Sequence, residues 1–125
     1  MRENKIRYSF FFIFIFSSAL SAEGLGSLLF HGNCITCHKE TKSISAPSVI
    51  EFKKHYLRAF PQKKDFVLYM SQWVQYPKKE TSIMQDSIEK YQLMPELGFE
   101  YSTLEIISEY IYETDFTKEH SGHQD

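Results

Sequence analysis

Apolar side chains in this chain recur at the spacing of helical turns, and no segment alternates apolar and polar residues as a strand would. The helical pattern runs through four segments between residues 25 and 111, and each would bury one stripe of side chains. The stripes are Leu25, Leu28 and Leu29; Val49, Phe52, Tyr56 and Ala59; Phe66, Tyr69 or Met70, Trp73 and Val74; and Leu104, Ile107, Tyr110 and Ile111. The pattern predicts an all-α fold.

Prolines and one polar cluster mark where these helices begin and end. Pro47 precedes the second stripe and suits the first turn of a helix. Pro61 ends that stripe, and Pro77 closes the third. Ser102 is followed three residues later by Glu105, which is the capping-box arrangement, so we expect Ser102 to be the N-cap of the last helix.

Two further segments carry weaker signals. Residues 78–92 place Ile83, Met84 and Ile88 at a spacing that suits a short helix, but Lys and Glu dominate the stretch and its structure is left open. Residues 117–125 are polar, and we expect them to form a flexible tail.

The first 22 residues have the three-part layout of a secretory signal peptide. A positive start with Arg2, Lys5 and Arg7 precedes the apolar run 10–16, and small residues follow as far as Ala22. The apolar run is too short for a stable transmembrane helix. We therefore expect residues 1–22 to be removed on export, with an uncleaved membrane anchor as the alternative.

The rest of the chain suits one small domain, which we place at residues 23–116. Without the signal peptide, the 14 Lys and Arg become 11 and the 16 Asp and Glu become 15, because Arg2, Lys5, Arg7 and Glu3 are lost. The formal net charge is then −4, which argues against nucleic acid as a partner. A domain of this size buries a modest share of its surface, so a large apolar cofactor would supply much of its core.

Cys34-Ile35-Thr36-Cys37-His38 carries the most specific chemistry in the chain. The C-x-x-C-H pentapeptide is the attachment signature of c-type haem: two thiols form thioethers with the haem vinyl groups, and the adjacent imidazole ligates iron. Cys34 and Cys37 are the only cysteines, so no disulfide to a third cysteine and no four-thiolate zinc site competes for them. A redox dithiol would need a βαβ pattern around the motif, and a zinc site would need further ligands nearby. We predict one covalent haem and keep these two readings as weaker alternatives.

The second face of the iron needs its own ligand, and Met94 is the best candidate. Pro95 follows it directly and Gly98 comes shortly after, so a stiff loop with a tight turn would hold the sulfur. A thioether is a soft neutral ligand that favours ferrous iron, so a His/Met pair raises the reduction potential. Met84 is the second candidate, although it lies in a helix-like pattern.

Three other side chains are weaker candidates for this position. Met70 belongs to a helical stripe and suits the core better. His31 stands seven residues before His38, which makes the opposite face of the ring hard to reach. His55 falls on a helix beside Lys54, as a surface residue would.

Together these features resemble a class I monohaem cytochrome c over residues 24–115. The resemblance rests on Gly26, Phe30, Cys34-Ile35-Thr36-Cys37-His38, Met94-Pro95 and Glu109-Tyr110-Ile111. It implies a small orthogonal helix bundle around one covalently attached haem. In that family the first and last helices cross, and Gly26 and Tyr110 are similar to that contact, with Phe30 beside it.

Two more positions enter through the resemblance. Ala46-Pro47-Ser48 is similar to the family loop whose proline carbonyl accepts a hydrogen bond from Nδ1 of the haem-ligating His, although the family more often has Gly before this proline. Trp73 is similar to the middle-helix Trp near a haem propionate, with plain burial in the core as the alternative. The haem-binding set is then Cys34, Cys37, His38, Pro47, Trp73 and Met94, in which His38 and Met94 bind the iron.

The resemblance implies an electron carrier and not an enzyme. Such a protein would be periplasmic, or membrane-anchored and facing the periplasm, and would exchange single electrons with a redox protein donor and acceptor. Association with a membrane respiratory complex is a further option, and no small-molecule substrate is expected. The alternative function is a haem-based sensor or small-ligand binder in which Met94 is displaced.

Overall fold

The computed structural model describes residues 22–118, and within this range it contains helices and no strands. Its elements are α1 (Ala22–Asn33), α2 (Val49–Ala59), α3 (Lys63–Gln75), the short 3₁₀ helix η1 (Lys79–Thr81), α4 (Gln85–Tyr91) and α5 (Tyr101–Glu113). The predicted all-α fold is confirmed. All of the predicted signal peptide except Ala22 lies outside the described residues, and so does the tail beyond residue 118.

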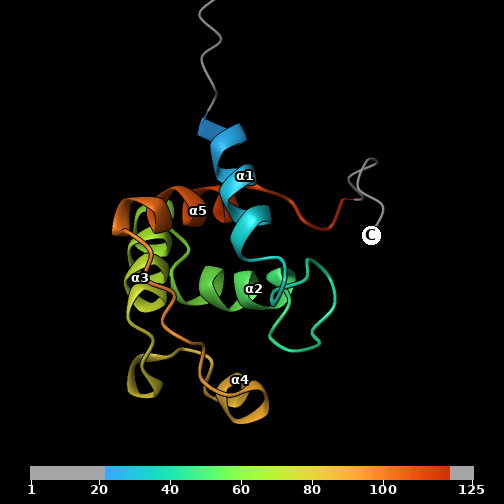
Figure 1. Ribbon diagram of the computed structural model, residues 1–125, viewed down its shortest axis with the longest axis vertical. Coiled ribbons are helices and arrows are strands. Elements are labelled where there is room, and N and C mark those ends of the chain that lie inside the picture. Colours follow the sequence, from blue (N-terminus) through green and yellow to red (C-terminus); the bar gives the residue numbers. More distant parts are fainter. Residues whose placement is uncertain (1–21, 119–125) are drawn as a thin grey trace, which may run out of the picture.

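Helix α5 is the centre of the arrangement. It packs mainly against α3 on one side and against α1 on the other, and Figure 1 shows α1 running across α5. Helix α2 makes smaller contacts with α3 and α5, and α4 lies at the end of the molecule farthest from α1. The chain between α4 and α5 returns along this whole length without forming a helix.

The crossing of α1 and α5 depends on Gly26. A Cβ atom at Gly26 would lie 2.6 Å from the Tyr110 Cβ and 3.2 Å from the Ile106 carbonyl oxygen, so only glycine allows the two backbones to come this close. The fully buried Phe30 lies beside this contact, with its ring centroid 5.7 Å from that of Tyr110. The predicted contact of Gly26 with Tyr110, with Phe30 beside it, is confirmed.

The predicted stripes are correct in most positions and wrong in two. Leu28 is 66% exposed, because the face of α1 that meets α5 carries Gly26 and Phe30 instead. Ala59 is exposed at the end of α2. Between the two alternatives on α3, Met70 is buried whereas Tyr69 is 47% exposed.

Two helix starts differ from the prediction. Helix α2 begins after Ser48, whose side chain accepts a hydrogen bond from the Glu51 amide at 3.2 Å, so Pro47 precedes the cap and does not occupy the first turn. The capping box at Ser102 is wrong. Helix α5 has Glu100 as its N-cap, and the Glu100 carbonyl already accepts hydrogen bonds from the amides of residues 103 and 104, which leaves Ser102 inside the first turn.

The undecided segment 78–92 forms η1 and α4, and Met84 directly precedes α4 as its N-cap. The following stretch bends at Gln92 and Gly98, whose φ angles are +75° and +71°, so Gly98 provides the turn expected of it. No helix within residues 22–118 has the length and apolar character needed to cross a membrane.

Candidate cofactor site

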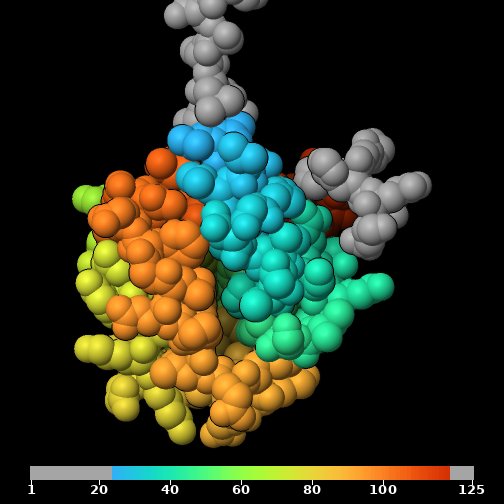
Figure 2. Space-filling model, in the orientation of Figure 1, coloured from blue at the N-terminus to red at the C-terminus, as the bar shows by residue number. Residues whose placement is uncertain are grey.

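One cavity of about 260 Å³ opens between the helices and the non-helical segments. Its walls come from the end of α1 and the turn after it, from α2, α3 and α5, and from residues 82–99. Figure 2 shows the surface hollowed between the region around residue 35 and the orange segment that leads into α5. The lining is mostly apolar and includes no Lys, Arg, Asp or Glu side chain. All six predicted haem-binding residues line it: Cys34, Cys37, His38, Pro47, Trp73 and Met94.

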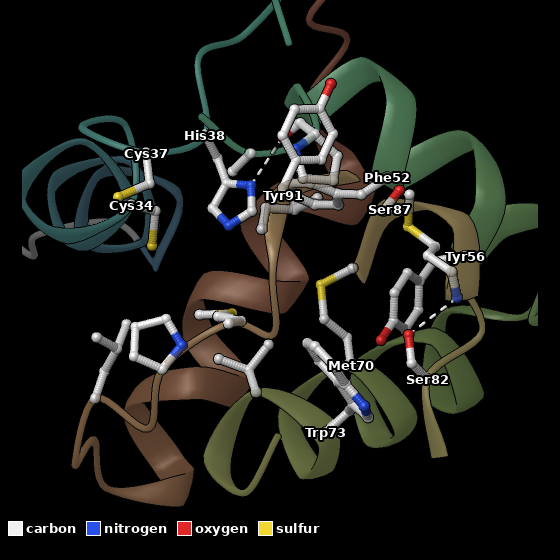
Figure 3. A pocket seen from close by; sticks show the side chains of 18 of the residues that line it. Cys34, Cys37, His38, Phe52, Tyr56, Met70, Trp73, Ser82, Ser87 and Tyr91 are labelled. Atoms are coloured by element: carbon white, nitrogen blue, oxygen red, sulfur yellow. Dashed lines mark hydrogen bonds between the residues drawn. The ribbon is translucent and has the colours of Figure 1, made fainter. Parts of the chain in front are cut away.

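The C-x-x-C-H segment from Cys34 to His38 forms a tight turn at the C-terminal end of α1. The Cys34 amide donates a hydrogen bond to the Phe30 carbonyl at 2.8 Å, and the amides of Cys37 and His38 donate to the Cys34 carbonyl at 3.2 and 2.9 Å. This turn brings two sulfurs and one imidazole to the same side of the cavity, as Figure 3 shows. The structure thus brings the three predicted residues of this segment together at one wall of the cavity.

The environment of Cys34 does not suit a redox dithiol. Burial, with a smaller contribution from the neighbouring Cys37, raises the pKa of the Cys34 thiol to about 11. Reactive cysteines in oxidoreductases have a lowered pKa, because the thiolate is the nucleophile. Within residues 22–118, moreover, no group of three or more His, Cys, Asp or Glu side chains is placed to hold a metal ion by itself.

The His38 imidazole faces the cavity and is held by a hydrogen bond to the main chain. Its Nδ1 lies 2.8 Å from the Pro47 carbonyl oxygen, which can only accept, so Nδ1 carries the proton and Nε2 keeps a free lone pair. Burial lowers the pKa of His38 and outweighs the hydrogen bond to Pro47, which acts in the opposite direction. The Phe52 ring stands nearly perpendicular to the imidazole at 5.1 Å between centroids and limits its rotation. The hydrogen bond predicted between His38 and Pro47 is therefore present.

Three methionines line the same cavity. Met94 is half-buried in the non-helical stretch between α4 and α5, as predicted, and Met84 is half-buried just before α4 and not within a helix. Met70 is 4% exposed on α3 and belongs to the core. The structure thus brings the predicted sulfur and its main rival to one site.

The histidine alternatives do not line the cavity. His31 has both ring nitrogens engaged, with Nδ1 2.8 Å from the Ser27 carbonyl oxygen and Nε2 3.2 Å from the Glu40 carboxylate. His55 is exposed on α2. Neither is placed to serve as a second ligand at this site.

Trp73 borders the cavity, but its polar atom is engaged elsewhere. The indole Nε1–H donates to the Lys78 carbonyl oxygen at 3.0 Å. This bond connects the last turn of α3 to the chain that leads into η1. The indole therefore helps to hold the cavity wall, and its N–H is not directed at an occupant of the cavity.

Two functional contributions were missed at the level of sequence. Phe52 and Tyr56 were assigned only to a buried stripe, yet Phe52 packs on the His38 ring and the Tyr56 phenol lines the cavity. The sequence offered one signal for these roles: Phe52 and Tyr56 follow Pro47 on the same predicted helix, and their spacing puts them on one helix face. Comparison of the chain with protein-family models found no match, and neither did searches of curated proteins and of solved structures.

Proposed function

We propose that this chain is an exported c-type cytochrome that carries single electrons between redox proteins. The observation that carries the proposal is the convergence of Cys34, Cys37 and His38 on one apolar cavity, with His38 Nδ1 hydrogen-bonded to Pro47. That bond leaves Nε2 as a neutral donor, the form in which histidine binds metals. The donor set and the apolar walls fit a covalently tethered haem.

Cys34 and Cys37 would form the tether. Each thiol adds across one vinyl double bond: the sulfur bonds to the carbon nearer the ring and the thiol hydrogen goes to the outer carbon, so no net oxidation is needed. The high pKa of Cys34 is compatible with this role, because the thioether product carries no charge in a mostly apolar wall.

The remaining residues would tune and protect the iron. A bound haem supplies a ferrous/ferric couple that exchanges one electron. The Pro47 carbonyl holds the Nδ1 proton and strengthens His38 as a donor, and Phe52 keeps the imidazole plane fixed. Met94 would provide a thioether on the other face, which favours the ferrous form and raises the potential.

The electron carrier and the sensory alternative differ in the state of Met94. Closed ligation by His38 and Met94 would leave no position for an exogenous ligand, whereas a sensor needs the Met94 sulfur to leave. The partners of the carrier would be a redox donor and acceptor, met in the periplasm after removal of residues 1–22. Association with a membrane respiratory complex is compatible with the same site.

A reduced-minus-oxidised spectrum of the purified mature protein, followed by addition of carbon monoxide, tests the function. We expect the sharp visible bands of a low-spin c-type haem on reduction and no change with carbon monoxide near neutral pH. Rapid carbon monoxide binding by the ferrous protein would support the small-ligand function in place of electron transfer. Absence of any haem bands after expression with a haem-attachment system would contradict both.

A further inference from the structure

Gln92 holds a backbone conformation that residues with a side chain rarely adopt. It follows Tyr91, the last residue of α4, and its φ and ψ angles are +75° and 167°. This conformation is used almost only by glycine, because a Cβ atom crowds the neighbouring backbone there. Within residues 22–118 the other positive φ belongs to Gly98, which has no Cβ. The strain at Gln92 therefore needs a physical reason.

The side chain of Gln92 does not supply this reason. It is exposed at the edge of the cavity, and its amide makes no hydrogen bond with another described residue. The backbone N–H of Gln92 donates to the Ile88 carbonyl oxygen at 2.9 Å, which closes the last turn of α4. The conformation of Gln92 thus sets the direction of the chain and serves no contact of its own side chain.

Helix α4 gives this turn a fixed base. It has no buried side chain, and hydrogen bonds hold it at its first residue. Gln85 Nε2 donates to the carbonyl oxygens of Lys79 and Ser82 at 2.6 and 2.9 Å. The Lys78 carbonyl accepts from the Trp73 indole at 3.0 Å, so the path of hydrogen bonds continues to α3.

Beyond Gln92 the chain lacks such support. Residues 93–99 form no hydrogen bond with any other described residue, and Pro95 has no N–H to donate. Met94 is the second residue after the turn and is half-buried at the cavity wall, whereas Leu93 is 42% exposed. The direction in which the chain leaves Gln92 therefore determines how Met94 enters the cavity.

We propose that Gln92 is a positioning residue whose strained backbone turns the chain so that the Met94 sulfur meets the iron. The proposal rests on the haem and the Met94 ligand proposed above. The strain is present while the turn is held, and it is relieved when Met94 leaves the iron and the turn relaxes. Only this difference between the two states can change the binding of the sulfur. Gln92 thus directs the sulfur and at the same time limits how firmly it is bound.

Imidazole, an exogenous ligand of ferric iron, measures how firmly the sulfur is bound. It competes with Met94, so its apparent dissociation constant rises when the sulfur is held more tightly. Oxidised, haem-loaded Gln92→Gly, Gln92→Ala and Gln92→Val are titrated with imidazole, and loss of the sulfur-to-iron band is followed.

The apparent dissociation constant of imidazole should follow the strain that each residue meets at position 92. We expect it to be about fivefold higher in Gln92→Gly than in the wild type, since loss of strain is partly offset by the greater freedom of glycine. It should be unchanged in Gln92→Ala, which keeps the Cβ. It should be about tenfold lower in Gln92→Val, because a β-branched side chain tolerates positive φ least.

Glu96→Val is the matched control. Glu96 is exposed on the same stretch outside the cavity lining, and its φ is not positive, so a β-branched side chain meets no comparable strain. Its imidazole dissociation constant should stay within about twofold of the wild-type value, as for an ordinary surface substitution.

Three results would overturn the inference while leaving the proposed haem intact. One is a constant in Gln92→Gly that is equal to or below the wild-type value, and this result decides even if Gln92→Val fails to retain haem. Another is a fall in Gln92→Ala as large as that in Gln92→Val, which would assign the effect to the amide. The third is an equal fall in Glu96→Val and Gln92→Val. A wild-type protein without haem would instead contradict the proposed function.

Discussion

Single side chains around the cavity differ in what else holds them, and this decides what each can contribute. His38 is fixed by Pro47 and Phe52, and the indole of Trp73 is fixed by Lys78. Met94 lies in a non-helical stretch whose turn at Gly98 has a φ of +71°. The neighbours of the His38 imidazole thus fix its orientation. The position of the Met94 sulfur depends instead on how the stretch around Met94 is held.

Replacement of Met94, the proposed sulfur ligand, gives the prediction at this scale. Met94→Ala should abolish the sulfur-to-iron charge-transfer band of the oxidised protein and open ferrous iron to carbon monoxide. The midpoint potential should fall by at least about 60 mV, which corresponds to a tenfold change in the equilibrium of a one-electron couple, because water stabilises ferrous iron less than a thioether does.

Met84→Ala is the control, since Met84 lines the same cavity and is equally half-buried. It should leave the charge-transfer band in place. If the band disappears in Met84→Ala and persists in Met94→Ala, the ligand is Met84.

The sequence could identify the C-x-x-C-H motif because its chemistry is local. It could not show that Met70, Met84 and Met94 all reach one cavity, because this convergence is a result of tertiary packing.

At the scale of helices, local patterns were sufficient for the existence of α1, α2, α3 and α5 but not for their ends. Apolar stripes at helical spacing are short-range features, so the four helices could be predicted. The first turn depends on how the chain enters each helix, which is why Ser48 is a cap and Ser102 is not. Residues 78–92 remained open because η1 and α4 have no buried side chain to give a stripe.

The crossing of α1 and α5 can be tested with two glycines of the same helix. Gly26→Ala should lower the free energy of unfolding by about 1–3 kcal/mol, because the added methyl meets Tyr110 and the Ile106 carbonyl. Gly32→Ala meets nothing within 4 Å and should raise stability by up to about 1 kcal/mol through helix propensity. Denaturant unfolding of the haem-loaded protein measures both, and equal effects of the two variants would contradict the close contact.

The helix caps give a second test at this scale. Ser48→Ala should cost about 1 kcal/mol of unfolding free energy, because the Glu51 amide loses its acceptor. Ser102→Ala should leave stability unchanged or raise it by up to about 0.5 kcal/mol, since Ser102 lies in the first turn of α5 and its side chain makes no cap. Thermal or denaturant unfolding compares the two variants. A larger loss of unfolding free energy in Ser102→Ala than in Ser48→Ala would support the predicted capping box.

At the scale of the whole molecule, α5 packs against α1 and α3, whereas α2 and residues 82–99 border a cavity. α2 makes only small contacts with α3 and α5, and the stretch from residue 82 to residue 99 meets the rest of the molecule largely across the cavity. An apolar cofactor would join these parts, because burial of apolar surface is the main favourable term in folding. The domain is small, so its stability without that contribution is marginal.

Removal of the tether therefore should unfold much of the protein. A Cys34→Ala/Cys37→Ala double variant, purified without haem, should show strongly reduced helical circular dichroism and no cooperative melt. The α1–α5 crossing, with Gly26 and Phe30 against Tyr110, is the part with the best chance of keeping residual helix. Native-like helicity with a sharp melt would show that the helices close without a cofactor.

The most direct measurement is acid–acetone extraction of the purified, denatured mature protein. If Cys34 and Cys37 hold haem through two thioethers, the colour should stay with the protein pellet in the wild type, and single Cys→Ala variants should retain one bond. Release of the haem into the acetone phase from the wild-type protein would contradict covalent attachment, and with it the central claim about this site.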